Sequence, residues 1–159
     1  MINITVRRAI PDDYKTIGRL LAEQVKMHRN GRPDIFKGSK GKYTYDDFCE
    51  LLSDPEVVIF TAVCGEAVAG YLICCIIEKK GEPILNDMTS LYLDDLCVGE
   101  DYRGTGAGKA LMCAAEEHAK SIGCHNVTLN VWEFNENARE FYEHLGYGTQ
   151  KRQMEKVLT

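Results

Sequence analysis

The chain contains 159 residues, of which 45% are apolar and 27% are charged, so we expect one globular domain over residues 1–159 that needs no disulfide or metal to fold. The net charge of −5 argues against nucleic acid or an anionic membrane as the main partner, because both bind clustered lysine and arginine. The same charge is compatible with a cationic substrate.

The first part of the chain predicts a strand, a helix and a loop. Residues 2–7 alternate as a short strand, and Pro11 with two following aspartates marks the start of a helix. The apolar side chains that fall on one face of this helix are Tyr14, Ile17, Leu20, Leu21 and Val25. Residues 28–43 are basic and rich in glycine, which predicts a long loop, or a long loop with one short helical turn near residues 34–37.

A second helix and two strands follow this loop. Thr44 and Asp47 form the pattern of a capping box before a short apolar run. Residues 57–63 and 68–77 predict two strands joined by a tight turn. Gly70, inside the second of these strands, indicates a bulge or a close approach of two backbones.

Residues 91–111 predict a strand, a glycine loop and a helix in direct succession. Gly104, Gly106 and Gly108 would let the backbone approach a ligand closely. The free N–H groups of the first helical turn would favour an anion at the same place. We therefore expect this loop to bind phosphate.

Two familiar phosphate loops do not fit these residues. The dinucleotide pattern G-x-G-x-x-G would need glycine where the chain has Lys109. The pattern G-x-x-x-x-G-K-S/T fails at both ends, because the chain has Arg103 and Ala110 at the decisive positions. The pattern that remains is Arg103-x-x-Gly106-x-Gly108.

The last part of the chain predicts a helix, a strand, a helix and two strands. The stripe of the first helix consists of Leu111, Ala115, Ala119 and Ile122, and Gly123 ends it. Residues 127–132 predict a fifth strand, and Asn135 or Asn137 caps a helix that runs through Leu145. Residues 147–158 predict two terminal strands around a turn near Lys151.

The glycine loop and a second motif resemble the signatures of one enzyme superfamily. The second motif reads Asn135-x-x-Ala138-x-x-Phe141-Tyr142-x-x-x-Gly146-Tyr147. Together the motifs are similar to Q/R-x-x-G-x-G/A and N-x-x-A-x-x-F/L-Y-x-x-x-G-F/Y of the GCN5-related N-acetyltransferase (GNAT) superfamily. The resemblance implies an α/β (α+β) fold with a mixed central sheet of six to seven strands and helices on both faces. It also implies transfer of the acetyl group of acetyl-CoA to a primary amine.

The resemblance assigns roles to the matching residues. The expected cofactor-binding residues are Leu96, Cys97, Val98, Arg103, Gly104, Thr105, Gly106, Ala107, Gly108, Lys109, Asn135 and Asn137. Residues 103–109 would hold the diphosphate of CoA, and backbone N–H groups of residues 96–98 would stabilise the oxyanion. Tyr142 would protonate the leaving thiolate as general acid, the alternative being a core tyrosine on an amphipathic helix.

Asp94 and Asp95 interrupt the apolar strand before the glycine loop. Strict alternation places Tyr92 and Asp94 on one face and Asp95 on the other, so only one aspartate could face a given pocket. A carboxylate there could take the proton of an ammonium group before the amine attacks a thioester. The segment L-D-D-L-x-V-x-x-x-Y-R-G resembles the diamine (polyamine) acetyltransferase branch, which favours Asp94 as the base, with Asp95 second. The alternative is a structural carboxylate.

The identity of the acceptor stays open at this point. We expect a small cationic amine, and the resemblance implies that the loop at residues 28–43 lines its site, the alternative being an ordinary surface loop. The expected acceptor residues are His28, Arg32, Phe36 and Tyr92. One alternative is a peptide or protein N-terminal acetyltransferase with an open groove between this loop and residues 79–89. Another is a CoA-binding sensor without turnover, and a homodimer is possible by analogy of fold.

The seven cysteines are odd in number and include no C-x-x-C pair, which indicates reduced thiols rather than disulfides or a metal site. An acetyl-cysteine intermediate at Cys97 is an alternative to direct transfer, although nothing marks this thiol as activated. The four histidines are scattered, so we expect no metal. The chain shows no secretory signal and no apolar run of membrane-spanning length, and we expect a cytoplasmic protein.

Overall fold

The computed structural model describes residues 2–38 and 41–159, and in this part of the chain five strands form one mixed sheet. The strands are β1 (Ile4–Arg8), β2 (Val57–Cys64), β3 (Ala67–Lys79), β4 (Met88–Val98) and β5 (Asn126–Leu129). The helices are α1 (Tyr14–Gly31), α2 (Tyr45–Ser53), α3 (Ala107–Ser121) and α4 (Glu136–His144), with 3-10 turns η1 (Pro11–Asp13) and η2 (Glu100–Tyr102).

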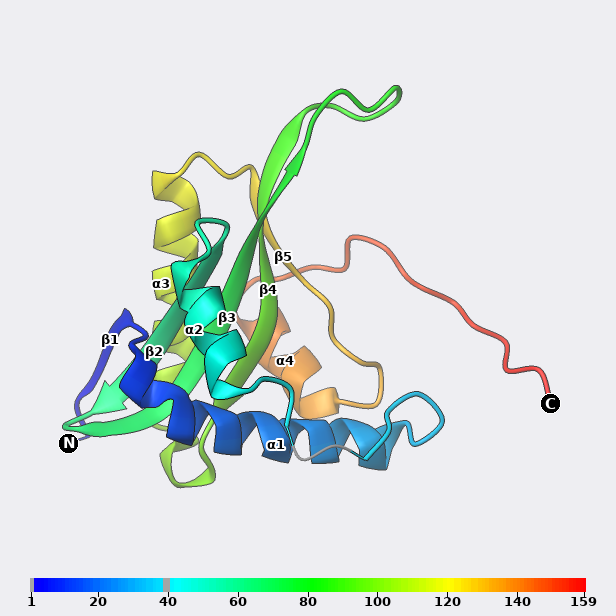
Figure 1. Cartoon of the computed structure of the whole chain (residues 1–159). Helices are drawn as coiled ribbons and strands as arrows, with labels where there is room; N and C mark the ends of the chain where they lie inside the picture. The colour runs from blue at the N-terminus through cyan, green and yellow to red at the C-terminus, as the bar shows by residue number, and fades with distance from the viewer. Residues whose placement is uncertain (1, 39–40) are drawn as a thin grey trace.

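The sheet has the order β1-β2-β3-β4-β5, in which the first four strands are antiparallel and β5 is parallel to β4. The mixed α+β sheet with helices on both faces is the expected architecture. The expected number of six to seven strands is wrong, because residues 147–158 form no strand in the structure. A strand needs a partner, and this tail leaves α4 and extends away from the sheet (Figure 1).

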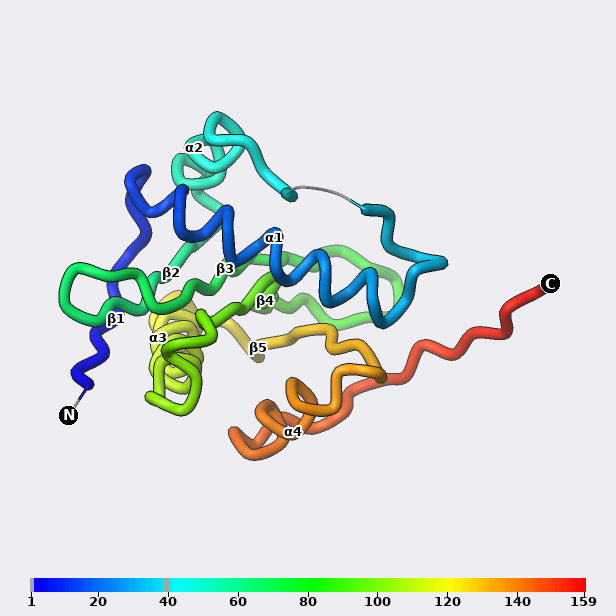
Figure 2. Tube along the Cα trace, turned by 90° about the horizontal axis from the view of Figure 1, so that it is seen from below, coloured from blue at the N-terminus to red at the C-terminus, as the bar shows by residue number. Residues whose placement is uncertain are grey.

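Two apolar layers hold the helices on the two faces of the sheet (Figure 2). On one face, α3 buries Leu111, Ala115 and Ala119, which is the predicted stripe, against the central strands. Ile122 lies beyond the end of α3 and is 40% exposed. On the other face, the buried side chains of α1 and α2 are Ile17, Leu20, Leu21 and Phe48.

The start of α2 confirms the predicted capping box. The Asp47 N–H donates to the Thr44 hydroxyl at 3.2 Å, and the Thr44 N–H donates to the Asp47 carboxylate at 2.8 Å. The start of the preceding loop was predicted too early, because α1 continues to Gly31 and makes His28 helical. A turn covers residues 33–35, and residues 39 and 40 of the predicted loop lie outside the described residues.

Gly70 confirms the prediction of close backbone packing in β3. A Cβ at this position would lie 2.7 Å from the Cys97 carbonyl oxygen, so no side chain fits between β3 and β4 there. A register shift between Ala62 and Val63 also places a bulge next to Gly70. Beyond this region the β3–β4 hairpin projects past the rest of the sheet (Figure 1). Within residues 2–38 and 41–159, no helix is both long and apolar enough to span a bilayer.

Candidate active site

A bulge in β4 brings both aspartates to the same cation. Ile73 pairs with Asp95 while the next residue of β3, Cys74, pairs with Leu93, so Asp94 is an extra residue in the β4 ladder. The Lys42 ammonium donates to Asp94 Oδ2 at 3.0 Å and to Asp95 Oδ2 at 2.6 Å. The expectation that only one aspartate can face a given pocket is therefore wrong, because the bulge interrupts the alternation on which it depended.

The carboxylate pair is unequally buried. The Asp95 side chain is 12% exposed, and that of Asp94 is 29% exposed. Burial raises the pKa of the Asp95 carboxyl, the bond to Lys42 offsets part of this rise, and the charge of Asp94 adds to it. Two carboxylates share one ammonium group, so the cluster keeps an affinity for a further cation.

Lys42 is held charged by this pair. Burial alone lowers the pKa of Lys42, but its hydrogen bond to Asp95 and the charges of both aspartates outweigh burial and raise the pKa above its usual range. The same charge, after burial, lowers the pKa of His28. His28 is therefore within electrostatic reach of Lys42.

Tyr142 on α4 is affected by the charge of Asp95, one member of the same acidic pair. Burial, and then the negative charge of Asp95, raise the pKa of Tyr142 to about 12. A raised pKa favours the neutral phenol, so the hydroxyl keeps its proton throughout the neutral pH range. Its ring contacts Phe141 and Tyr147 at centroid distances of 5.2 and 6.0 Å, which fixes it against the core. The group is thus a buried proton donor near a carboxylate.

The parallel pairing between β4 and β5 stops just before the bulge. The last pair is Leu93 with Leu129, and β5 ends at this residue. Among the described residues, positions 94–98 of β4 have no partner on the β5 side, and the chain after β5 diverges from β4 (Figure 1). Backbone groups at residues 96–98 can therefore meet a ligand entering between the strands.

Gln24 of α1 and Tyr71 of β3 stabilise this stretch of β4 by a chain of hydrogen bonds. The Tyr71 hydroxyl donates to Gln24 Oε1 at 3.2 Å, and Gln24 Nε2 donates to the Leu96 carbonyl at 3.0 Å. Tyr71 is fully buried, so the bridge from β3 through α1 fixes the orientation of the Leu96 peptide. Neither residue belonged to the sequence-based site.

The glycine loop has the geometry of an anion cradle. Gly104 and Gly106 have φ angles of 76° and 89°, a region that side chains other than glycine rarely adopt. A Cβ at either position would meet no described atom within 4 Å, so the outer surface of the loop is open to a ligand. Gly106 is the N-cap of α3, which leaves the first-turn N–H groups without a side-chain cap.

The residues of this loop divide into two kinds. The N–H groups of Arg103 and Thr105 already donate to Glu100 and Tyr102 at 3.2 and 3.3 Å, so they stabilise the turn itself. At Gly108, the second residue of α3, an added Cβ would lie 3.2 Å from the Phe141 ring of α4, so this side of the residue is packed. The N–H groups available to an anion are thus fewer than the whole run of residues 103–109.

The N-terminus of α4 lines a cavity of about 310 Å³ opposite the end of α1. Asn135 caps the helix as predicted, since its Oδ1 accepts the Ala138 N–H at 3.2 Å. Asn137 lies in the first turn of α4. The lining residues are Met27, Gly31, Phe134, Asn135, Glu136 and Asn137.

An aromatic cluster joins the end of α1 to the segment after β5. His28 stacks on Phe36 at 5.1 Å, and Phe36 meets Trp132 edge to face at 5.2 Å. Arg32 differs from these two expected acceptor residues, because its guanidinium is bound by Asp34 and by Glu155 of the C-terminal tail. The structure therefore brings His28 and Phe36 together and turns Arg32 toward an ion-pair network.

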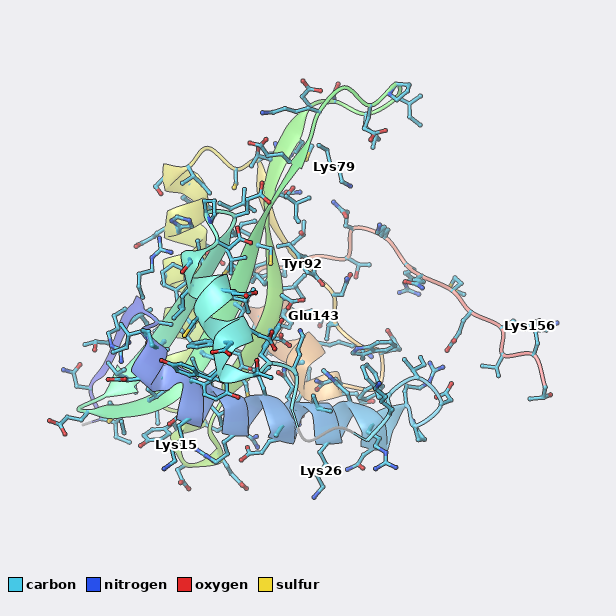
Figure 3. The ribbon with its side chains drawn as sticks, in the orientation of Figure 1. Lys15, Lys26, Lys79, Tyr92, Glu143 and Lys156 are labelled. Atoms are coloured by element: carbon cyan, nitrogen blue, oxygen red, sulfur yellow. The ribbon has the colours of Figure 1, made fainter. Side chains whose placement is uncertain are left out.

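Tyr92 lies on β4, two residues before the bulge at Asp94 (Figure 3). Its hydroxyl accepts a hydrogen bond from Asn130 Nδ2 at 3.2 Å. Cys97 lies beyond the bulge, where burial raises the pKa of its thiol to about 11. A thiol with this pKa is protonated at neutral pH and is a poor nucleophile. Within the described residues, no group of three or more histidine, cysteine or acidic side chains could hold a metal ion.

Three residues with contacts in this site were not among the site residues predicted from the sequence: Lys42, Gln24 and Tyr71. Lys42 lies 53 residues before Asp95 in a loop of several basic residues, so no local pattern distinguishes it. Gln24 and Tyr71 looked like ordinary members of a helix and a strand. Only the packing of α1 across β3 and β4 reveals their contacts.

Comparison with known proteins finds relatives among N-acetyltransferases. A 5-NmdU N-acetyltransferase of Pseudomonas phage PaMx11 is 30% identical over 145 residues, which are 91% of this chain and 86% of the phage protein. A glucosamine 6-phosphate N-acetyltransferase of Trypanosoma brucei brucei is 40% identical over 63 residues. This match covers 40% of the present chain and 41% of the trypanosomal enzyme, less than half of each.

A solved structure and a family model extend over most of the chain. A mutant of the BH1408 protein from Bacillus halodurans has a TM-score of 0.94 and 27% identity, and the match covers 98% of this chain and 99% of that one. The model of the Acetyltransferase (GNAT) family matches residues 25–147, from α1 to the end of the second motif. The chain therefore belongs to the GNAT family of N-acetyltransferases, for which acetyl-CoA is the donor.

Proposed function

We propose that this enzyme transfers the acetyl group of acetyl-CoA directly to a primary amine of a small cationic acceptor. One observation carries the proposal: a primary ammonium, that of Lys42, already sits on Asp94 and Asp95 at 3.0 and 2.6 Å. An ammonium group of an acceptor has the same charge and the same donors, so the carboxylate pair suits it equally.

On the donor side, we propose that the diphosphate of CoA binds at the start of α3. The open surface at Gly104 and Gly106 and the uncapped first turn support this placement. Arg103 and Lys109 flank the loop and would add positive charge. The arm of CoA would then run along the part of β4 that has no β5 partner.

On the acceptor side, we propose that Asp95 takes the proton that the ammonium must lose, directly or through water. The sequence pattern ranks Asp94 first, but the deeper burial of Asp95 and its raised pKa support Asp95 as the base, with Asp94 orienting the ammonium. The raised pKa of Cys97 supports direct transfer over an acetyl-cysteine intermediate.

The remaining two steps use the backbone and α4. We propose that N–H groups at residues 96–98 stabilise the oxyanion of the tetrahedral intermediate, in a stretch of β4 braced by Gln24 and Tyr71. Tyr142 would then give its proton to the departing thiolate of CoA. Its phenol is buried and neutral, and it lies close enough to Asp95 to be affected by the charge of that carboxylate; both properties support this role.

The test is a panel of amines with acetyl-CoA, followed by release of free thiol. The panel holds diamines, amino sugars, aminoglycosides, free amino acids and peptides with a free N-terminus. We expect release with small cationic amines. Release with peptides alone would replace the proposal by a peptide acetyltransferase, and binding of acetyl-CoA without amine-stimulated release would replace it by a sensor.

A further inference from the structure

We propose that Lys42 is itself an acetyl acceptor of this enzyme, so that the chain acetylates this side chain when no amine substrate is present. The inference rests on the proposed function, because it uses the same bound acetyl-CoA and the same proton acceptor. It adds a modification site on a residue that lies outside both family motifs.

The position of the Lys42 ammonium is the first argument. Its nitrogen lies 2.6 Å from Asp95 Oδ2, the group proposed to take the proton of the acceptor. Asp95 also acts electrostatically on Tyr142, the group proposed to protonate the departing thiolate. The Lys42 nitrogen thus lies beside the proposed proton acceptor, and it becomes a nucleophile once Asp95 has taken its proton.

The rigidity of the arrangement is the second argument. Two carboxylates fix the ammonium, and the nitrogen also lies 5.2 Å from the centre of the Tyr43 ring. The Lys42 side chain is 38% exposed, so its partners do not enclose it completely. A nucleophile held in one geometry reacts far faster than a free amine at ordinary concentration.

The reaction balances with the components already named. Asp95 takes one proton from the Lys42 ammonium, and the free amine attacks the carbonyl carbon of acetyl-CoA to form a C–N bond. The C–S bond then breaks, and the thiolate leaves as CoA with the proton of Tyr142. The second proton of the nitrogen passes to water, and the tyrosinate recovers a proton from solvent. The products are N-acetyl-Lys42, CoA and one net proton.

The modification would change the site. An acetylated Lys42 has no positive charge, so it can no longer neutralise Asp94 and Asp95. The freed carboxylates would bind a cationic acceptor more strongly, because the internal competitor is gone. Lys42 acetylation would therefore be a single first turnover that prepares the acceptor site.

Other lysines of the chain provide matched controls. The Lys80 ammonium is also paired, with Glu78 at 3.1 Å, but its side chain is 64% exposed and lies on the projecting hairpin. Lys26 on α1 points away from the sheet, and Lys79 lies on the same hairpin as Lys80 (Figure 3). These three lysines should behave as ordinary surface amines.

The experiment incubates the purified full chain with acetyl-CoA and no amine, and follows acetyl occupancy at each lysine by peptide mass spectrometry. We expect Lys42 to approach one acetyl group per chain and to exceed Lys26 and Lys80 by about 10-fold or more in rate. The rate should not change on dilution of the protein, because donor and acceptor are bound to one chain. Excess butane-1,4-diamine should slow it by competing for the carboxylate pair.

The variants separate an enzymatic step from chemical labelling. Lys42→Arg should lose the label, Lys80→Arg should keep it, and Tyr142→Phe should slow it by about 100-fold. Acetic anhydride should label exposed Lys26 before Lys42, which is held protonated. Labelling of Lys42 at the same rate in Tyr142→Phe, or a rate that rises with protein concentration, would overturn the proposal.

Failure of this inference differs from failure of the proposed function. If the amine panel gives turnover while Lys42 stays unmodified, Lys42 is not an acceptor and the proposed function stands. If neither any amine nor Lys42 is acetylated although acetyl-CoA binds, the proposed function fails and this inference fails with it. Acetylated Lys42 without turnover on any amine would support the inference alone and refute a small-molecule acceptor.

Discussion

The donor end and the acceptor end of this molecule are built in different ways. The proposed donor site is a continuous stretch in which Gly104 and Gly106 expose the backbone before α3. The proposed acceptor site gathers side chains from distant positions, with Lys42 from the loop before α2 and two aspartates from a bulge in β4. One end uses the peptide backbone and the other uses side-chain charge.

The difference teaches which part of the function can vary. In the proposed donor site, backbone groups would recognise the diphosphate of acetyl-CoA, which does not change with the acceptor, and a local glycine motif is enough to present them. Side chains from a loop and from β4 would recognise what differs between amines. The acceptor end can therefore change by single substitutions that leave the donor end intact, and the predictions below test this separation.

The largest expected effect is at the donor end. Gly106→Val places a β-branched residue at a φ of 89°, which is strained and fills the open surface of the loop. We expect acetyl-CoA affinity to fall by about 100-fold or more, since strain of about 1–3 kcal/mol adds to the steric block. Calorimetry with acetyl-CoA measures this. Gly148→Val, in the tail with open space around it, is the control and should bind normally.

The second effect is catalytic and should leave donor binding unchanged. Tyr142→Phe removes the proton donor but keeps the ring contacts with Phe141 and Tyr147. We expect kcat to fall by about 100-fold with little change in the affinity for CoA. Tyr147→Phe loses a hydroxyl bonded to Glu116 instead and should stay close to wild type. Equal rates for Tyr142→Phe and the wild type would remove Tyr142 from the mechanism.

The third effect divides the acceptor end into its two carboxylates. The base must be ionised, so kcat/KM should fall as the pH is lowered through the raised pKa of Asp95, at a higher pH than for an ordinary aspartate. Asp95→Asn should lower kcat about 100-fold and abolish this acid limb. Asp94→Asn should mainly raise KM, by about 10-fold, and keep the limb. The opposite pattern in the pH profiles would make Asp94 the base.

The smallest effect concerns Gly108, where an added Cβ would point at the Phe141 ring and not at open space. Gly108→Ala places a Cβ 3.2 Å from the Phe141 ring, while alanine favours the helix by about 1 kcal/mol over glycine. We expect the two effects nearly to cancel, with a change in unfolding free energy within about 1 kcal/mol. Acetyl-CoA affinity should stay within about threefold of wild type. A loss as large as that of Gly106→Val would show that Gly108 also contacts the donor.

The predictions from sequence were right for local features of the fold and wrong where the outcome depends on pairing with a distant segment. The capping box at Thr44 and the stripe of α3 depend on neighbours in sequence, and both formed. The two terminal strands did not form, because a strand pattern in residues 147–158 says nothing about whether an edge is within reach. The limit of α1 at Gly31 rather than before His28 shows the same dependence, since Phe134 packs over that last turn.

The candidate site was predictable to a similar degree. Motifs in the sequence located the glycine loop, Asn135 as a cap, and the two aspartates. The bulge at Asp94 could not be foreseen, because a register shift is a property of two strands and not of one. Lys42 was missed for the same reason, since its partners are distant in sequence.

The irregularity at Asp94 has a consequence for protein engineering. A graft of the two acidic residues onto a regular strand of another scaffold would send their side chains to opposite faces of the sheet. The graft would carry the composition of the site without its chemistry. The additional residue in β4 is therefore part of the proposed acceptor site, and the partner strand that accommodates it must be transferred together with the acids.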